Sequence, residues 1–170
     1  AERVGADIRF GLATKVDFSG PIHKVWIDEE TEIHAKSVII ATGAEAKWLG
    51  MPSEKRLNGS GVSACAVCDG FLFKGKEVAI VGAGDTACEE ALYLSNLCPH
   101  VHMIVRREQM RASKIMQDRV IAKENITIYW NSETDDILGE HKVEGVRLKN
   151  NKTNELTEIK VEGFFVAIGH

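Results

Sequence analysis

Apolar residues recur at two different spacings along the second half of the chain. The run at 76–81 has the length of a buried strand, and Ala87, Ala91 and Leu94 follow it at the spacing of one helix face. The same alternation then continues, with a strand at 101–105, a second helix from about 109 to 123, and a strand at 126–130. This order predicts an α/β fold built on a parallel sheet.

The remaining apolar runs are shorter and predict only strands. Residues 143–149 and 156–161 alternate around a turn-rich stretch, which predicts an antiparallel hairpin inserted before a last apolar run at 164. Near the N-terminus, strands are predicted at 8–10, 23–27, 32–34 and 38–41, with Asp28, Glu29 and Glu30 in the turn between the middle two.

No convincing helix accompanies these N-terminal strands, so they would leave one face of a sheet uncovered. We therefore expect residues 1–45 to be part of a domain and residues 46–170 to form a second domain. The polar stretch from Gly50 to Gly61 is expected to connect them.

Composition and charge exclude several classes of protein. The 170 residues are 44% hydrophobic and 27% charged, which favours a folded globular protein over a disordered one. A net charge of −4 with interspersed signs offers no basic stripe for nucleic acid. Neither a membrane span nor a signal peptide is apparent, so we expect a cytoplasmic protein. Ala1 and His170 both look like cut ends.

The glycine-rich turn after the strand at 76–81 predicts a dinucleotide site. Its sequence is Gly82-Ala83-Gly84-Asp85-Thr86-Ala87, between a strand and a helix, as the dinucleotide fingerprint requires. Gly82 would allow the tight turn, Gly84 would let the backbone approach a pyrophosphate, and Ala87 takes the third small position. The alternative is a plain strand-to-helix turn that needs glycine only for its dihedral angles.

Paired arginines stand where NAD enzymes place an acidic residue, about 20 residues beyond such a turn. Arg106 and Arg107 would bind a 2′-phosphate through charge-assisted hydrogen bonds, and Arg111 would reach the same spot from the first turn of the next helix. A solvated basic face is the alternative. Together with the glycine-rich turn, the arginines favour NADPH.

Cys65 and Cys68 are spaced as a CxxC pair, which can close a small disulfide ring that is easily reduced. The competing interpretation is half of a zinc site. Structural zinc needs four ligands, and the other cysteines, Cys88 and Cys98, form no second CxxC pair. We predict no metal, a core position for Cys88, and ordinary edge positions for His100 and His102. Asp69, directly after Cys68, is either an acid–base group or a turn residue before Gly70.

These motifs together closely resemble the low-molecular-weight, bacterial-type thioredoxin reductases, which are class II pyridine nucleotide-disulfide oxidoreductases. The resemblance covers essentially the whole chain. It rests on the motifs just described and on two further segments, Ala41-Thr42-Gly43 and Phe165-Val166-Ala167-Ile168-Gly169-His170.

The resemblance implies a three-layer, Rossmann-like NADPH-binding domain with an antiparallel insertion, preceded by a β-rich piece of an FAD-binding domain. It implies that NADPH reduces FAD, FAD reduces the disulfide, and the dithiol reduces thioredoxin. Cys68 would face the flavin, Cys65 would attack thioredoxin, and Asp69 would donate the proton. Thr42 and Gly43 would belong to the flavin surface, and Ile168 and Gly169 to the cofactor surface. Hinges near Glu45 and Gly169 and a homodimer of the full-length protein are also implied.

The chain departs from the family pattern in one residue and in extent. Val105 stands where the family usually has a histidine, so we expect weaker selectivity for NADPH. The family's other flavin motifs lie outside these residues, so the fragment alone is expected not to turn over. Two alternatives stay open: the flavoprotein partner of a peroxidase, against which the arginines argue, and a non-catalytic nucleotide-binding module.

Overall fold

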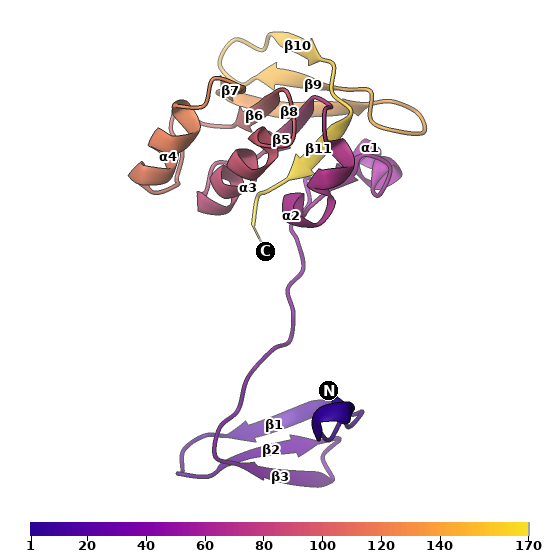
Figure 1. Cartoon of the computed structure of the whole chain (residues 1–170), viewed down its shortest axis with the longest axis vertical. Coiled ribbons are helices and arrows are strands. Elements are labelled where there is room, and N and C mark those ends of the chain that lie inside the picture. Colours follow the sequence, from indigo (N-terminus) through magenta and orange to yellow (C-terminus); the bar gives the residue numbers. More distant parts are fainter. Residues whose placement is uncertain (170) are drawn as a thin grey trace. The chain divides into compact units, whose positions relative to one another are not determined.

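The structure, a computed structural model, describes residues 1–169, which separate into two compact units. The first unit is Ala1–Gly43, and the second begins at Ala44 (Figure 1). Within residues 1–169, we find no helix with the length and hydropathy of a membrane-spanning segment.

The first unit is a short antiparallel sheet in the order β1-β2-β3. Its elements are η1 (Glu2–Val4), β1 (Ala13–Asp17), β2 (His23–Ile27) and β3 (Thr31–Ala35). The predicted turn is confirmed, since Asp28 and Glu29 join β2 to β3 with φ angles of 52° and 65°. The strands predicted at 8–10 and 38–41 are wrong, because no strand of the unit pairs with either segment.

The second unit is built on a parallel sheet of five strands in the order β4-β11-β5-β6-β7. Its strands are β4 (Val62–Ser63), β5 (Val78–Val81), β6 (Val101–Val105), β7 (Ile126–Trp130) and β11 (Gly163–Val166). The predicted α/β fold is confirmed. β5 is apolar throughout because both faces of the sheet are covered, so every side chain of the strand is buried.

Helices cover one face of this sheet and a second sheet covers the other (Figure 1). The helices are α3 (Asp85–Ser95) and α4 (Lys114–Ile121), while the short α2 (Ala66–Asp69) and η2 (Gly70–Phe73) precede β5. The antiparallel sheet consists of β8 (Ser132–Leu138), β9 (Gly145–Asn150) and β10 (Leu156–Ile159). The predicted three-layer architecture with an antiparallel insertion is confirmed.

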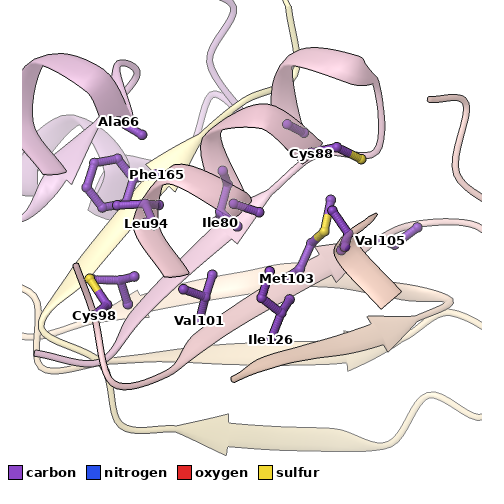
Figure 2. Close-up of a cluster of buried hydrophobic side chains, with 14 of the residues drawn as sticks. Ala66, Ile80, Cys88, Leu94, Cys98, Val101, Met103, Val105, Ile126 and Phe165 are labelled. Carbon is purple, nitrogen blue, oxygen red and sulfur yellow. The ribbon is translucent and has the colours of Figure 1, made fainter. Parts of the chain in front are cut away.

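Two apolar cores lie between these layers. On the helix side, Ile80, Leu94, Met103 and Phe165 belong to one buried cluster (Figure 2). On the other side, residues of alternate strand positions, such as Ala79 and Ile104, pack with β8 and β9. Because side chains alternate across a strand, β5 and β6 contribute to both cores.

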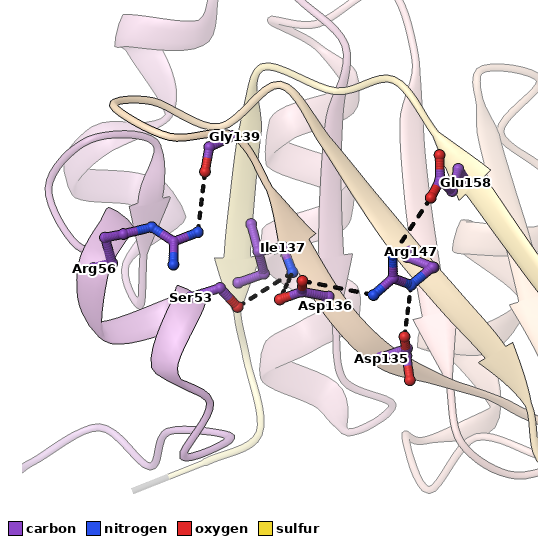
Figure 3. A network of polar contacts seen from close by, with 8 residues as sticks. All are labelled: Ser53, Arg56, Asp135, Asp136, Ile137, Gly139, Arg147 and Glu158. Carbon is purple, nitrogen blue, oxygen red and sulfur yellow. Dashed lines mark hydrogen bonds and ion pairs between the residues drawn. The ribbon is translucent and has the colours of Figure 1, made fainter.

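Hydrogen bonds join the antiparallel sheet to α1 (Pro52–Leu57), and ion pairs of Arg147 link the strands of the sheet to one another (Figure 3). Ile137 N donates to Ser53 Oγ at 3.3 Å, and Arg56 Nη2 donates to the Gly139 carbonyl at 3.0 Å. Arg147, in the middle strand β9, lies 2.7 Å from Asp135 of β8 and 3.6 Å from Glu158 of β10. One guanidinium group therefore links all three strands.

Three local expectations need correction, and β8 was not predicted. The stretch 50–61 contains α1, because Pro52 opens a helix and the Glu54 carboxylate accepts hydrogen bonds from the N–H groups of Leu49 and Gly50. The second helix begins at Lys114, not near 109, and β8 had no predicted counterpart. His102 lies buried in β6, an inner strand between β5 and β7, so its predicted edge position is wrong.

Candidate functional site

The turn between β5 and α3 requires glycine at Gly82 for the fold itself. Gly82 has a φ of 151°, and a Cβ atom there would collide with the carbonyl oxygen of Ala167 and lie 2.7 Å from Cβ of Ala87. The small residue at Ala87 therefore allows the start of α3 to approach the turn closely. This position is structural, whatever the turn binds.

Gly84 is needed for a different reason. Its φ of −92° is accessible to any residue, and a Cβ atom there would meet nothing within 4 Å. The missing side chain leaves open space directly in front of the N-terminus of α3, where unpaired N–H groups and the helix dipole favour an anion. The geometry fits a pyrophosphate that approaches the backbone at Gly84.

The loop 106–113, which carries the three arginines, is tied to this turn. The N–H groups of Arg111 and Ala112 donate to the Ala83 carbonyl at 2.8 and 3.0 Å. Ser113 donates to Asp85 Oδ1 through its N–H at 2.9 Å and its hydroxyl at 2.7 Å, and these bonds lower the pKa of Asp85. Arg111 therefore reaches the site from a tethered loop and not from a helix.

A cleft of about 540 Å³ opens at the carboxyl ends of the parallel strands. The predicted residues that line it are Gly82, Gly84, Thr86, Ala87, Arg106, Arg107, Arg111, Ile168 and Gly169. Asp85 does not line it, since its carboxylate is directed to Ser113. Thr42 and Gly43 belong to an exposed segment of the first unit and are not among the lining residues. The structure thus brings most of the predicted cofactor residues to one cleft.

The arginines share a second cavity of about 550 Å³ that adjoins the cleft. Their side chains are exposed, and within residues 1–169 none of the three guanidinium groups forms an ion pair. Val105, just before them, is fully buried in the helix-side core, so its side chain does not face this cavity. Unpaired cations that converge on a cavity fit an anionic ligand such as a 2′-phosphate.

The dithiol lies at the start of α2, which packs against α3. Cys65 and Cys68 form a disulfide bond, so neither is a thiolate ligand for zinc in this structure. Cys68 is exposed, Cys65 is half-buried, and the Cys68 N–H donates to Cys65 Sγ at 3.2 Å. Among the described residues, no cluster of three His, Cys, Asp or Glu side chains could hold a metal ion.

Ser63, a residue that the sequence did not single out, connects Asp69 to the dithiol. Its hydroxyl donates to Asp69 Oδ2 at 2.6 Å and accepts a hydrogen bond from the Cys65 N–H at 3.0 Å. Ser63 is buried at the end of β4, so its position is set by the parallel sheet. Ser63 therefore bridges the Asp69 carboxylate to the backbone of Cys65.

The two other cysteines belong to the core, as predicted for Cys88. Burial raises the pKa of Cys88 and of Cys98 to about 11. The Cys98 thiol donates to the Phe73 carbonyl at 3.4 Å, and the Cys88 thiol lies 3.7 Å from Met110 Sδ. Both thiols are therefore inert packing groups near neutral pH.

Several cleft residues were missed because no local motif marks them. Leu49, Met51, Ser132, Glu133 and Thr134 line the main cleft, and Asn131 and Lys152 line the arginine cavity. They come from the segment before α1, from β8 and its preceding turn, and from the β9–β10 hairpin. Only the tertiary fold places them beside the glycine-rich turn.

Comparison with known proteins agrees with this geometry. The chain is 46% identical to a thioredoxin reductase from Rickettsia conorii over 173 residues, covering all of this chain and 56% of the relative. It is 50% identical over 145 residues to NADPH-dependent thioredoxin reductase 3 of Arabidopsis thaliana, covering 83% of this chain and 27% of that protein. The chain thus spans about half the length, or less, of these relatives.

Among solved structures, a thioredoxin reductase from Giardia duodenalis matches with a TM-score of 0.85 at 38% identity, covering 99% of this chain and 55% of the other. The family model for pyridine nucleotide-disulphide oxidoreductases matches residues 2–170. The chain, whose second unit holds both a disulfide and a cleft lined by the glycine-rich turn, therefore belongs to the pyridine nucleotide-disulphide oxidoreductase family.

Proposed function

We propose that the whole protein is a thioredoxin-disulfide reductase (EC 1.8.1) that takes its electrons from NADPH. One observation carries the proposal: a disulfide and a cleft with an unpaired arginine cavity lie in the same unit, joined by the packing of α2 on α3. Relatives named thioredoxin reductase match the full length of this chain, which supports the same substrate.

The cleft would hold NADPH in one orientation. The pyrophosphate would lie at Gly84 and the helix N-terminus, and the 2′-phosphate would lie among Arg106, Arg107 and Arg111. The nicotinamide end would then extend toward Ile168 and Gly169, across the point where strand order reverses between β5 and β11. Asp85 would act by holding the arginine loop through Ser113.

FAD is proposed as the second cofactor on the strength of family membership. When both are bound, NADPH would supply two electrons through FAD, and these would reduce the Cys65–Cys68 disulfide to two thiols. Asp69, held by Ser63, would move a proton to or from the cysteines. The Cys68 N–H that reaches Cys65 Sγ would stabilise a Cys65 thiolate, which supports Cys65 as the group that attacks thioredoxin. The exposed Cys68 would then face the flavin.

An apolar surface beside the dithiol supports a protein substrate. Val67, Phe71 and Leu72 are 66%, 67% and 69% exposed, and all three belong to the short helices that follow Cys65. Exposed apolar side chains grouped around a reactive group are typical of a docking surface. A thioredoxin molecule would cover them while its disulfide meets Cys65.

The first unit is proposed to be the β-rich part of the FAD-binding domain, with the boundary near residue 45. None of its described residues is buried, and Phe10 and Ile39 are 99% and 91% exposed, so its sheet needs a covering layer. Hinges would lie near Glu45 and Gly169, where Lys47 N donates to the Gly169 carbonyl at 2.9 Å. The whole protein would be cytoplasmic and would form a homodimer. Light scattering can test the dimer.

Trapping of a mixed disulfide tests the proposal without any flavin. The Cys68→Ser variant, reduced and desalted, should capture thioredoxin that carries an activated disulfide, through a Cys65–thioredoxin bond seen as a band that reductant removes. The matched Cys65→Ser variant should capture far less. Equal capture by both variants, or by neither, would contradict the assignment of roles. For the whole protein, NADPH-driven reduction of thioredoxin is the direct assay.

A further inference from the structure

A fourth cation, supplied by the β9–β10 hairpin, faces the arginine cavity. Lys152 lines the same 550 Å³ cavity as Arg106, Arg107 and Arg111, although it lies 41 or more residues further along the chain. The proposed function does not use this residue, and no motif in the sequence marks it.

The hairpin tip is fastened to the arginine loop, so the position of Lys152 is not accidental. Asn151 Nδ2 donates to the Arg106 carbonyl at 2.6 Å, and the Asn151 N–H donates to the Asn131 carbonyl at 2.8 Å. Asn131 in turn donates from its N–H to the Arg107 carbonyl at 3.2 Å. These bonds, one from the Asn151 side chain and two between main-chain groups, hold the hairpin tip and Lys152 beside the loop.

The ammonium group of Lys152 has a single acidic partner among the described residues. Lys152 Nζ lies 2.8 Å from Glu108 Oε2, and their side chains are 59% and 68% exposed. This ion pair lowers the pKa of Glu108. Because exposed ion pairs of this kind are weak, a phosphate dianion in the cavity can compete for the ammonium group. Among the described residues, Glu108 is also the only acid that lines the cavity.

We propose that Lys152 is a specificity-determining residue, which binds the 2′-phosphate of NADPH together with the three arginines, and that Glu108 opposes it. Glu108 holds Lys152 while the cavity is empty and repels the phosphate when it enters. Lys152 then exchanges a carboxylate oxygen for a phosphate oxygen. This inference rests on the proposed NADPH specificity.

Calorimetric titration of the chain with NADP⁺ and NAD⁺ tests the proposal, since the two ligands differ only in the 2′-phosphate. Lys152→Ala should weaken NADP⁺ binding about 3- to 10-fold and leave NAD⁺ binding unchanged, while Lys152→Arg should retain most of the affinity. Glu108→Gln should tighten NADP⁺ binding about 2- to 5-fold, again without effect on NAD⁺.

Lys160→Ala is the matched control, because it removes the same charge from a lysine that lines a different cavity. If Lys152→Ala lowers the NADP⁺ to NAD⁺ affinity ratio no more than Lys160→Ala does, the role of Lys152 is disproved while the proposed function stands. If the unmodified chain itself does not prefer NADP⁺, the proposed NADPH specificity fails, and this inference fails with it.

Discussion

The hydroxyl group of Ser63 joins Asp69 to the backbone of Cys65, with hydrogen bonds of 2.6 and 3.0 Å. One buried side chain at the end of β4 therefore holds both the proposed proton donor and the proposed nucleophile. The two hydrogen bonds connect the end of β4 to both ends of α2, so the parallel sheet positions the disulfide and the neighbouring carboxylate.

Replacement of Ser63 by alanine should loosen this arrangement. The variant loses two hydrogen bonds and leaves Asp69 without its partner, so we expect a loss of about 1–2 kcal/mol in unfolding free energy. Urea denaturation of both proteins measures this loss in unfolding free energy. We also expect the trapping of thioredoxin by the reduced dithiol to slow. Ser60→Ala, at an exposed position nearby, is the control. Unchanged stability and trapping rate in Ser63→Ala would show that the hydroxyl does not position Asp69.

The two glycines of the turn should respond differently to alanine. Gly82→Ala forces a Cβ atom against the backbone of Ala167 and should destabilise the fold by about 1–3 kcal/mol or more. Gly84→Ala places its Cβ in open space and should cost no more than about 1 kcal/mol. It should nevertheless weaken NADP⁺ binding about tenfold, since the methyl group occupies the space of the pyrophosphate. Equal nucleotide affinity in Gly84→Ala and the unmodified chain would argue against a pyrophosphate at this position.

Alkylation should distinguish the four cysteines by their burial. At pH 7.5 a thiol with a pKa of about 11 is ionised in fewer than about one molecule in a thousand, so Cys88 and Cys98 should not react in the folded chain. Mass spectrometry should find no label on the oxidised protein, two labels after reduction, and four after reduction and denaturation. Labelling of Cys88 or Cys98 under native conditions would show that the helix-side core opens readily.

His102 should make stability fall on mild acidification. Burial lowers its pKa from the ordinary 6.5 and His100 lowers it further, although Glu77 acts in the opposite direction. The unfolded chain binds the proton on His102 more readily than the folded chain does. The contribution of His102 to the unfolding free energy is therefore complete above about pH 6.5, and it is lost as the pH falls through the lower pKa of His102 in the folded chain.

Urea midpoints measured from about pH 7.5 to about pH 5 test this dependence. His102→Gln, which keeps a polar side chain near Glu77 and Tyr129 but does not titrate, should show a shallower decline than the unmodified chain. Parallel curves for the two proteins would mean that other groups cause the loss of stability.

Most of the residues that line the proposed site could be predicted from the sequence, because its motifs are local. A CxxC pair, a glycine-rich turn between a strand and a helix, and paired arginines at the correct distance each need only neighbouring residues. Likewise, the apolar runs at 76–81 and 101–105 predicted the central parallel strands, since strands buried on both faces require such runs. Polar β8 escaped prediction because its pairing with β9, and not its own pattern, makes it a strand.

The tertiary structure alone decided which side chains meet at the site. Ser63 reaches Asp69 because β4 joins the edge of the sheet, and Asp85 binds Ser113 because α3 and α4 pack on the same face. Lys152 reaches the arginine cavity because a hairpin folds back over the loop. The reason is physical. A motif depends on backbone geometry within a few residues, whereas these contacts depend on where distant segments lie after the layers have packed around the two apolar cores. The sequence by itself determined the reactive groups, and the packing of the layers determined what holds each of them.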